Sequence, residues 1–290
     1  MSEQIETLLK ESRTYQPTAK TIAAAYIKEY EAEYNKSIAD PETFWSNAAK
    51  ELEWFAPWNK VLEWDYPWAK WFVDARCNIV YNCLDRHVKT WRKNKVALIW
   101  VGENDQERIF TYGELYRQVN RCANALKKLG VQKGDRVTIY LPKVPEQVIA
   151  MLACARIGAI HSVVYSGFSA PALASRVNDA EAKLVITADV GFDRGKVINL
   201  KPVVDEALKS CPTVGHVVVV RRQVPGPALS APKEIDWGDW IKQESARCEA
   251  EQLDAETPLY ILYTSGTTGK PKGVVHVHGG YMVGTYLTTK

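Results

Sequence analysis

A stretch near the end of the chain, YTSGTTGKPKGVVHVHGG (263–280), carries the residue types that bind polyphosphate. Small hydroxyl residues, three glycines and two lysines fall within positions 263–273. The hydroxyls and the unobstructed N–H groups beside the glycines can donate several hydrogen bonds, and a lysine supplies the positive charge that phosphate oxygens favour. The stretch therefore predicts a loop that binds the phosphates of a nucleotide.

Two other phosphate-binding loops do not fit this spacing. A Walker A loop needs G-x-x-x-x-G-K-S/T between a strand and a helix. Here Gly266 and Gly269 are only three apart, and Lys270 is followed by Pro271. The kinase-type spacing G-x-G-x-x-G is also missing. A plain hairpin turn is the structural alternative, although such turns need only about two to five residues.

The elements that must position this loop form a regular alternation of strands and helices. Two strands, 258–265 and 273–278, flank the loop. Before them, we expect strands at 136–141, 161–165, 184–188 and 216–220, and helices at 111–130, 145–158, 169–182 and 201–211. Short β-branched runs between helices predict an α/β fold, with a helix-covered and mainly parallel sheet. Ligands of such sheets bind beyond the carboxyl ends of the strands.

The chain divides into three predicted parts, 1–105, 106–240 and 241–290. Eight of the ten tryptophans lie in the first part, an N-terminal extension that we expect to be irregular and anchored by aromatic side chains. Exposed aromatic rings that stack on carbohydrate are the functional alternative, but no paired carboxylates accompany these tryptophans. The second part is the first α/β subdomain, and its final 221–240 predicts a loop between subdomains. The third part begins a second subdomain, with a second sheet started at 258–278.

Composition excludes several classes of protein. The net charge is only +3 and no basic run occurs, so nucleic acid is not an expected partner. No apolar run is long enough to span a membrane, and the N-terminus lacks a secretory signal. The six cysteines form no C-x-x-C pair, which favours reduced thiols in a cytoplasmic protein. His276 and His278 lack neighbouring ligands, so we expect strand packing or polar lining rather than a metal site.

The 263–280 stretch resembles the signature of the adenylate-forming enzymes, which include acyl-CoA synthetases, luciferases and peptide-synthetase adenylation domains. Segments 39–88 and 130–189 resemble the acetyl-CoA synthetases and their near relatives. The resemblance covers nearly the whole chain after residue 20. It implies a ligase that activates acetate or a similar short acid with Mg²⁺ and ATP to an acyl-adenylate, and then transfers the acyl group to coenzyme A. Propionyl-CoA synthetase is an alternative in the same class.

The resemblance also implies which residues bind. Lys272 would be catalytic, because it would neutralise charge on the leaving pyrophosphate. Gly167, Arg194 and Lys196 would bind coenzyme A, although Asp193 stands where the family commonly has a basic residue; a solvated charged loop is the structural alternative. The residues expected around the β- and γ-phosphates are Thr264, Ser265, Gly266, Thr267, Thr268 and Gly269.

In the family, the adenine and acyl pockets, the magnesium ligands and a lid with a second catalytic lysine lie beyond the position of Lys290. We therefore expect this chain to be the N-terminal portion of the enzyme, inactive alone. A natural, truncated, non-catalytic protein that binds a nucleotide or a partner is the alternative, and the reading frame after Lys290 distinguishes the two. Acetate, ATP and coenzyme A are the expected partners, and either a homo-oligomer or association with the C-terminal remainder would fit.

Overall fold

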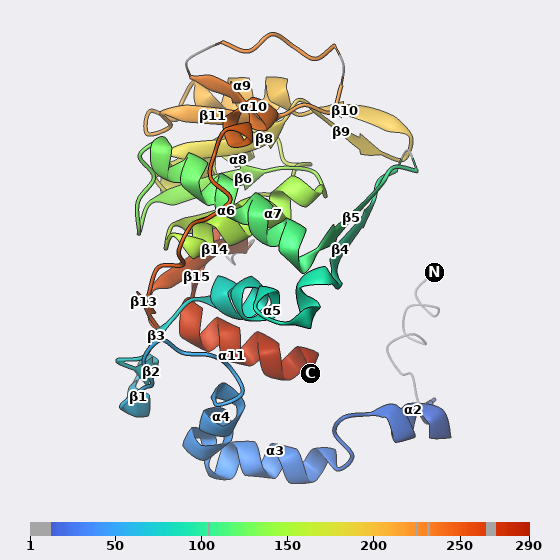
Figure 1. The fold of residues 1–290 in the computed structure, drawn as a ribbon, viewed down its shortest axis with the longest axis vertical. Helices are drawn as coiled ribbons and strands as arrows, with labels where there is room; N and C mark the ends of the chain where they lie inside the picture. The colour runs from blue at the N-terminus through green and yellow to red at the C-terminus, as the bar shows by residue number, and fades with distance from the viewer. Residues whose placement is uncertain (1–12, 104, 224, 231–232, 265–270) are drawn as a thin grey trace, which may run out of the picture.

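A seven-stranded sheet forms the centre of the computed structural model, which describes residues 13–103, 105–223, 225–230, 233–264 and 271–290 (Figure 1). Every neighbouring pair in this sheet is parallel except the last, which is antiparallel. The predicted α/β class with a mainly parallel sheet is thus confirmed. From one edge to the other, the strands are β12 (Glu234–Asp236), β11 (His216–Val220), β8 (Leu184–Ala188), β6 (Arg136–Tyr140), β7 (Ile160–Val163), β14 (Pro258–Thr264) and β15 (Lys272–Val277).

Helices cover both faces of this sheet (Figure 1). The helix α6 (Tyr112–Lys128) contacts both α7 (Pro145–Arg156) and α10 (Trp237–Lys242) on one face. The helices α8 (Ala170–Asp179) and α9 (Lys201–Leu208) pair on the other. Right-handed crossovers explain this division, because β7 and β8 lie on opposite sides of β6 and their connecting helices must pass over opposite faces.

The largest helix has the ends that its sequence predicts. The Thr111 hydroxyl accepts a hydrogen bond from the Glu114 N–H at 3.2 Å, and the Glu114 carboxylate accepts one from the Thr111 N–H at 2.8 Å. After α6, Gly130 adopts a φ of +80°, a left-handed conformation that glycine adopts at little cost. Local capping therefore sets both ends of α6.

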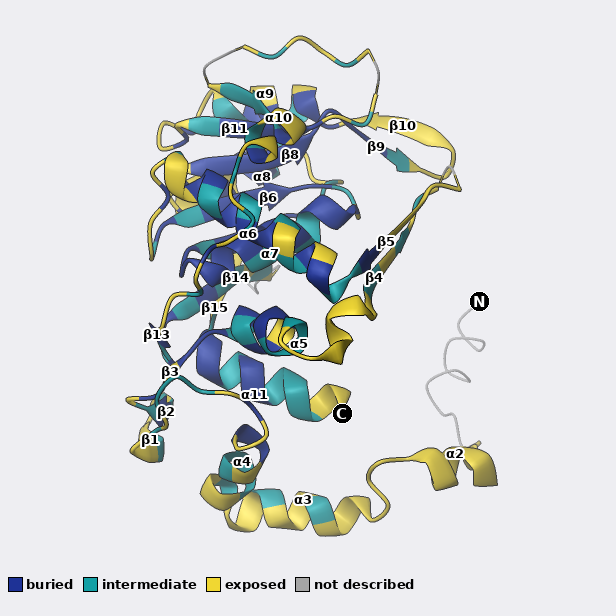
Figure 2. Ribbon diagram, in the orientation of Figure 1, coloured by how far each residue is buried: buried dark blue, intermediate teal, exposed yellow. Residues whose placement is uncertain are grey.

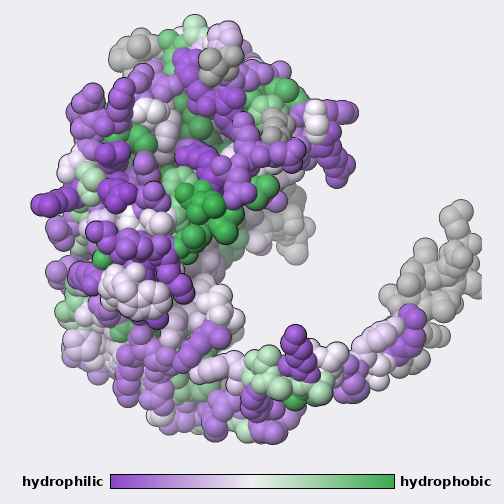
Figure 3. All heavy atoms as spheres, turned by 45° about the vertical axis from the view of Figure 1, so that its right-hand side comes forward, coloured by the Kyte–Doolittle hydropathy of each residue, from purple (hydrophilic) through white to green (hydrophobic). Residues whose placement is uncertain are grey.

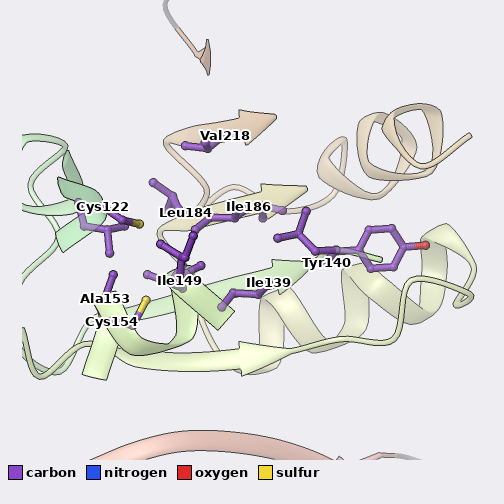
Figure 4. Packing of buried hydrophobic residues seen from close by; sticks show 14 of the residues in the cluster. Cys122, Ile139, Tyr140, Ile149, Ala153, Cys154, Leu184, Ile186 and Val218 are labelled. Atoms are coloured by element: carbon purple, nitrogen blue, oxygen red, sulfur yellow. The ribbon is translucent and has the colours of Figure 1, made fainter. Parts of the chain in front are cut away.

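The hydrophobic core lies between the sheet and the helices on its faces, and Figure 4 shows its central residues. Helical side chains pack on strand side chains that are buried on both faces of the sheet, as a parallel sheet requires. Burial of these side chains is the dominant favourable contribution to folding. The core residues labelled in Figure 4 are Cys122, Ile139, Tyr140, Ile149, Ala153, Cys154, Leu184, Ile186 and Val218.

Two predictions about the later part of the chain are wrong. The expected loop 221–240 ends in β12 and the start of α10, because β12 pairs with β11 through a tertiary contact that local composition does not encode. The strands β14 and β15 do not start a second sheet: β14 pairs with β7 and so continues the first one. The second strand also ends one residue early, and His278 begins α11 (His278–Thr289).

Aromatic packing in the N-terminal part is confirmed, but the expected irregular backbone is wrong: this part forms helices and the antiparallel pairs β1–β2 and β4–β5. The ring centroids of Trp54, Trp58 and Phe72 lie 5.2 Å apart in each pair. By contrast, Trp64 and Trp68 are exposed. The elements of this part are α2 (Ala19–Ala24), α3 (Tyr30–Ala39), α4 (Pro41–Ala49), β1 (Lys60–Asp65), β2 (Trp68–Val73), β3 (Arg76–Cys77), η1 (Tyr81–Asp85), α5 (Arg86–Val88), η2 (Trp91–Asn94), β4 (Val96–Val101) and β5 (Glu107–Thr111).

Three smaller features complete the fold. The helices α2 and α3 bury no residue and project away from the body (Figures 2 and 3). Two further strands, β9 (Val190–Asp193) and β10 (Lys196–Asn199), form a hairpin, and β13 (Leu253–Asp254) pairs with β3. Over the described ranges, no helix combines the length and apolar character that crossing a bilayer requires.

Candidate active site

The strand order places the predicted binding segments on one edge of the sheet. From β6 the chain moves to β7 on one side and then to β8 on the other, so the order of strands reverses at β6. In α/β sheets the crevice beyond the carboxyl ends at such a reversal is the usual ligand site. The turn 165–168 follows β7 and the β9–β10 hairpin follows β8, while β14 runs parallel to β7 and ends at Thr264. All three segments therefore leave the sheet at its carboxyl edge.

The structure brings together the first and last residues of the predicted phosphate site. Thr264 and Lys272 are direct cross-strand partners on β14 and β15, and both are exposed. The remaining predicted phosphate ligands, Ser265, Gly266, Thr267, Thr268 and Gly269, lie outside the described residues. Lys272 belongs to a paired strand, so its backbone is anchored, as the sequence predicted.

Tyr263 connects this strand pair to helix α8. Its ring lies over Gly273, where an added Cβ would come within 3.3 Å of the ring. Its hydroxyl donates a 2.6 Å hydrogen bond to the Asp179 carboxylate. Burial, together with the hydrogen bond to Asp179 and the negative charge of that carboxylate, raises the pKa of Tyr263. The residue next to Thr264 is thus fixed by both its neighbouring strand and a helix.

Gly167 lies in a tight turn after β7. The Phe168 N–H donates to the Tyr165 carbonyl oxygen at 3.0 Å. The Tyr140 hydroxyl lies 2.9 Å from the Ser166 carbonyl oxygen and 2.8 Å from that of Phe168. A Cβ on Gly167 would lie 2.4 Å from the Tyr165 ring, which is itself exposed. Because glycine has no Cβ, the Tyr165 ring can occupy the space beside residue 167.

Arg194 and Lys196 lie on the β9–β10 hairpin. Arg194 and Gly195 form its turn with φ values of +51° and +73°, as a two-residue hairpin turn requires. Their N–H groups point at one carboxylate, that of Glu103, with distances of 3.0 and 3.2 Å. Adjacent N–H groups in such a turn form an anion-binding concavity. Glu103 follows β4, far away in sequence, and no local signal predicted this contact.

Arg222 is a second residue at this edge that the sequence reasoning missed. It follows β11, and its guanidinium lies 4.7 Å from the ring centroid of Phe192 and 5.9 Å from that of Trp100. Burial lowers the pKa of Arg222, while the charges of Glu146 and Asp189 act in the opposite direction. A basic pair directly after a predicted strand, RR at 221–222, is the signal that could have identified it.

The histidines near the strand pair take part in aromatic packing. Tyr260 stacks on His161 on one side and on His276 on the other, with centroid distances of 5.5 and 4.7 Å. His278 is buried, and burial lowers its pKa to about 3. Across the part of the chain that the structure describes, no group of three or more His, Cys, Asp or Glu side chains could hold a metal ion. These residues therefore do not fit a magnesium site.

Two family models match the chain. Residues 84–290 match the model described as "AMP-binding enzyme", and residues 30–83 match "Acetyl-coenzyme A synthetase N-terminus". The two matched segments are adjacent and together leave only the first residues unmatched.

Curated relatives and solved structures agree with these matches. The chain is 50% identical to an acetyl-coenzyme A synthetase of Deinococcus radiodurans over 100% of its own length and 45% of the relative. It is 54% identical to the enzyme of that name from Methanothrix thermoacetophila, over 85% of this chain and 38% of the relative. An acetoacetyl-CoA synthetase from Streptomyces lividans superposes with a TM-score of 0.84 at 30% identity, covering 94% of this chain and 44% of that one. The chain thus spans less than half the length of these relatives.

Proposed function

This chain belongs to the AMP-binding enzyme family, and from that premise we propose that it is the N-terminal part of an acetate–CoA ligase. The observation that carries the proposal is 50% identity along the whole chain to an acetyl-coenzyme A synthetase. The match of residues 30–83 to the N-terminal segment of that enzyme supports acetate or a similar short acid as the substrate. The complete protein would join the acid to AMP with loss of pyrophosphate, and then replace AMP by coenzyme A.

In this proposal, the β14–β15 pair handles the phosphates of ATP. Thr264 donates from its hydroxyl to a phosphate oxygen, together with Ser265, Gly266, Thr267, Thr268 and Gly269. Lys272 stabilises the negative charge that develops on the departing pyrophosphate, and a positioned cation near a developing charge lowers the barrier most effectively. Their cross-strand pairing supports a shared role for Thr264 and Lys272.

The coenzyme A part of the proposal rests on the turn 165–168 and the β9–β10 hairpin. Gly167 lets the backbone pass close to the Tyr165 ring, and a ligand would reach this backbone where that exposed ring moves aside. Arg194 with Lys196 supplies positive charge for the nucleotide phosphates. Lys196 is exposed at the start of β10, where its side chain can reach a ligand. Asp193 directly precedes this turn and is the cross-strand partner of Lys196, so it reduces the local positive charge beside both cations.

Magnesium would enter with ATP, but the described residues offer no set that fits it, so we assign it no residue and no step in this chain. ATP, coenzyme A and a short carboxylic acid are the proposed small-molecule partners. A cytoplasmic location, a homo-oligomer and the three-part division 1–105, 106–240 and 241–290 stay predictions.

Acetate-dependent exchange of pyrophosphate into ATP tests the proposal. The reading frame that contains this chain should be expressed in full beside residues 1–290 alone. We expect exchange and coenzyme A-dependent AMP formation from the full protein, and background exchange from residues 1–290. Acetate should be preferred over propionate, and the opposite preference would favour the propionyl-CoA synthetase alternative. A reading frame that stops at Lys290 would instead favour the truncated, non-catalytic protein.

A further inference from the structure

Arg176 of helix α8 lies between two segments of the proposed site. Its side chain is buried, with the residue 8% exposed. Its guanidinium carbon lies 4.4 Å from the ring centroid of Phe168, beside Gly167, and 5.7 Å from that of Tyr263, beside Thr264. A cation attracts the faces of aromatic rings, and more strongly where water is excluded. Arg176 therefore holds one aromatic residue from each segment.

The hydrogen bonds of Arg176 do not account for its position. Its Nη1 donates to the Ala172 carbonyl oxygen of the same helix at 2.7 Å. Among the described residues, no carboxylate forms an ion pair with the Arg176 guanidinium. A buried charge costs free energy unless it is compensated. The hydrogen bond to Ala172 and the two ring faces thus compensate this charge, and the ring faces are the contacts that tie it to the site.

Asp179 extends the same connection. It lies three residues after Arg176, so both side chains project from one face of α8. The Tyr263 hydroxyl donates to the Asp179 carboxylate at 2.6 Å and lies 3.5 Å from the Arg176 carbonyl oxygen. The Tyr263 ring is also confined by Gly273 on the adjacent strand. Helix α8 therefore fixes both the ring and the hydroxyl of Tyr263.

The turn 165–168, which carries Phe168, is also held in place. Phe168 immediately precedes the Ser169 N-cap of α8, so the turn and the helix are continuous. The buried Tyr140 at the end of β6 holds the same turn through its hydroxyl, at 2.8 Å from the Phe168 carbonyl oxygen. The turn therefore has little freedom to shift without moving α8.

We propose that Arg176 and Asp179 are positioning residues, which hold the strand ends that carry Thr264 and Lys272 in a set place relative to the turn that carries Gly167. This proposal rests on the proposed function, because it assigns ATP phosphates to the first segment and coenzyme A to the second. Neither residue touches a reacting atom. Small displacements of positioned groups slow catalysis severely, so residues that prevent displacement affect the rate.

Tyr263→Phe and Asp179→Asn test the hydrogen bond between Tyr263 and Asp179 in the full-length protein. Each should slow acetate-dependent ATP–pyrophosphate exchange at saturating ATP by roughly 3- to 10-fold, the equivalent of one hydrogen bond. The double variant should be no slower than either single variant, because both remove the same bond. Tyr286→Phe is the matched control: it removes a hydroxyl that donates to Glu51 at 2.7 Å, and it should leave exchange unchanged.

Arg176→Gln tests the cation. We expect slower exchange and a raised apparent KM for coenzyme A, with Arg176→Lys recovering part of both because it keeps the charge without the planar guanidinium. The proposal would be overturned if the losses of exchange rate added up in the Tyr263→Phe/Asp179→Asn double variant. It would also be overturned if the Arg176→Gln protein kept the wild-type exchange rate and the wild-type apparent KM for coenzyme A. If Arg176→Gln fails to fold, the double-variant comparison decides the role of Asp179 and Arg176→Lys decides that of the cation. Loss of the planar guanidinium alone should then raise the apparent KM for coenzyme A, and an unchanged KM would overturn this part of the proposal. Failure of the proposed function looks different, since wild-type protein would then lack exchange altogether.

Discussion

Asp85 and Arg156 form a doubly hydrogen-bonded ion pair in the interior of the protein. Both Nη–Oδ distances are 2.8 Å, and the Arg156 side chain is fully buried. The Arg156 Nε also donates to the Cys248 carbonyl oxygen at 2.6 Å. The pair thus connects η1, α7 and the segment before β13, which are far apart in sequence.

Asp85→Asn should destabilise the chain strongly. The change leaves the buried Arg156 without its counter-charge, and breaking such a pair costs about 3–5 kcal/mol. Urea denaturation followed by tryptophan fluorescence measures the free energy of unfolding. Glu33→Gln is a suitable control, because Glu33 forms an exposed pair with Lys36 that should contribute less than about 1 kcal/mol. Equal losses in the two variants would show that the buried pair has no special role.

Lys272→Ala should slow adenylation by the full-length protein roughly 10- to 1000-fold, the range for loss of one preorganised group that stabilises developing charge. Lys272 is anchored in β15 opposite Thr264. Lys270 lies outside the described residues, and from its position before Pro271 we expect Lys270→Ala to cost only a few-fold. ATP–pyrophosphate exchange of the two variants, each first shown to be folded, makes the comparison. A larger loss at Lys270 would contradict the assignment.

Changing both Arg194 and Lys196 to Ala should raise the apparent KM for coenzyme A. The two cations lie on the β9–β10 hairpin, on a different segment from Thr264 and Lys272. Exchange does not involve coenzyme A, so it should stay close to the wild-type rate. Steady-state kinetics with varied coenzyme A, beside exchange in its absence, separates the two effects. Exchange that falls as far as the overall reaction would argue against a coenzyme A role.

Stability should fall when the pH drops below about 6.5, the usual pKa of histidine in an unfolded chain. Burial lowers the pKa of His161 to about 4, and burial with the nearby charges of His161 and Lys133 lowers that of His278 to about 3. Between these values and 6.5, the unfolded state binds protons that the folded state does not. The free energy of unfolding should then decrease with falling pH, approaching about 1.4 kcal/mol per pH unit for each histidine.

Urea denaturation at pH 7.5, 6 and 5 measures this dependence. Above pH 6.5 both histidines are neutral in both states, so they should contribute no slope there. His161→Gln should reduce the slope between pH 6 and 5 by the share of one histidine. An unchanged slope in this variant, or equal stability at pH 7.5 and 5 in the wild type, would contradict the assigned burial.

The sequence by itself determined the features that depend on near neighbours. The capping pair Thr111 and Glu114 and the left-handed Gly130 set the ends of α6, and both follow from local hydrogen bonding and backbone sterics. The alternation of strands and helices could be predicted for the same reason, since hydrophobic periodicity reflects which face each element buries. The residue types of 263–280 likewise supply hydrogen-bond donors and positive charge for phosphate, and this does not depend on where the loop lies in the fold.

Only the tertiary structure decided which distant segments meet. Arg194 and Glu103 are 91 residues apart, and Asp85 and Arg156 are 71 apart, so no local pattern relates them. Periodicity also could not show that β14 joins β7 or that β12 joins β11, because strand order follows from crossovers and global packing. The place of Arg176 between Phe168 and Tyr263 has the same cause: it exists only once β7, α8 and β14 are assembled.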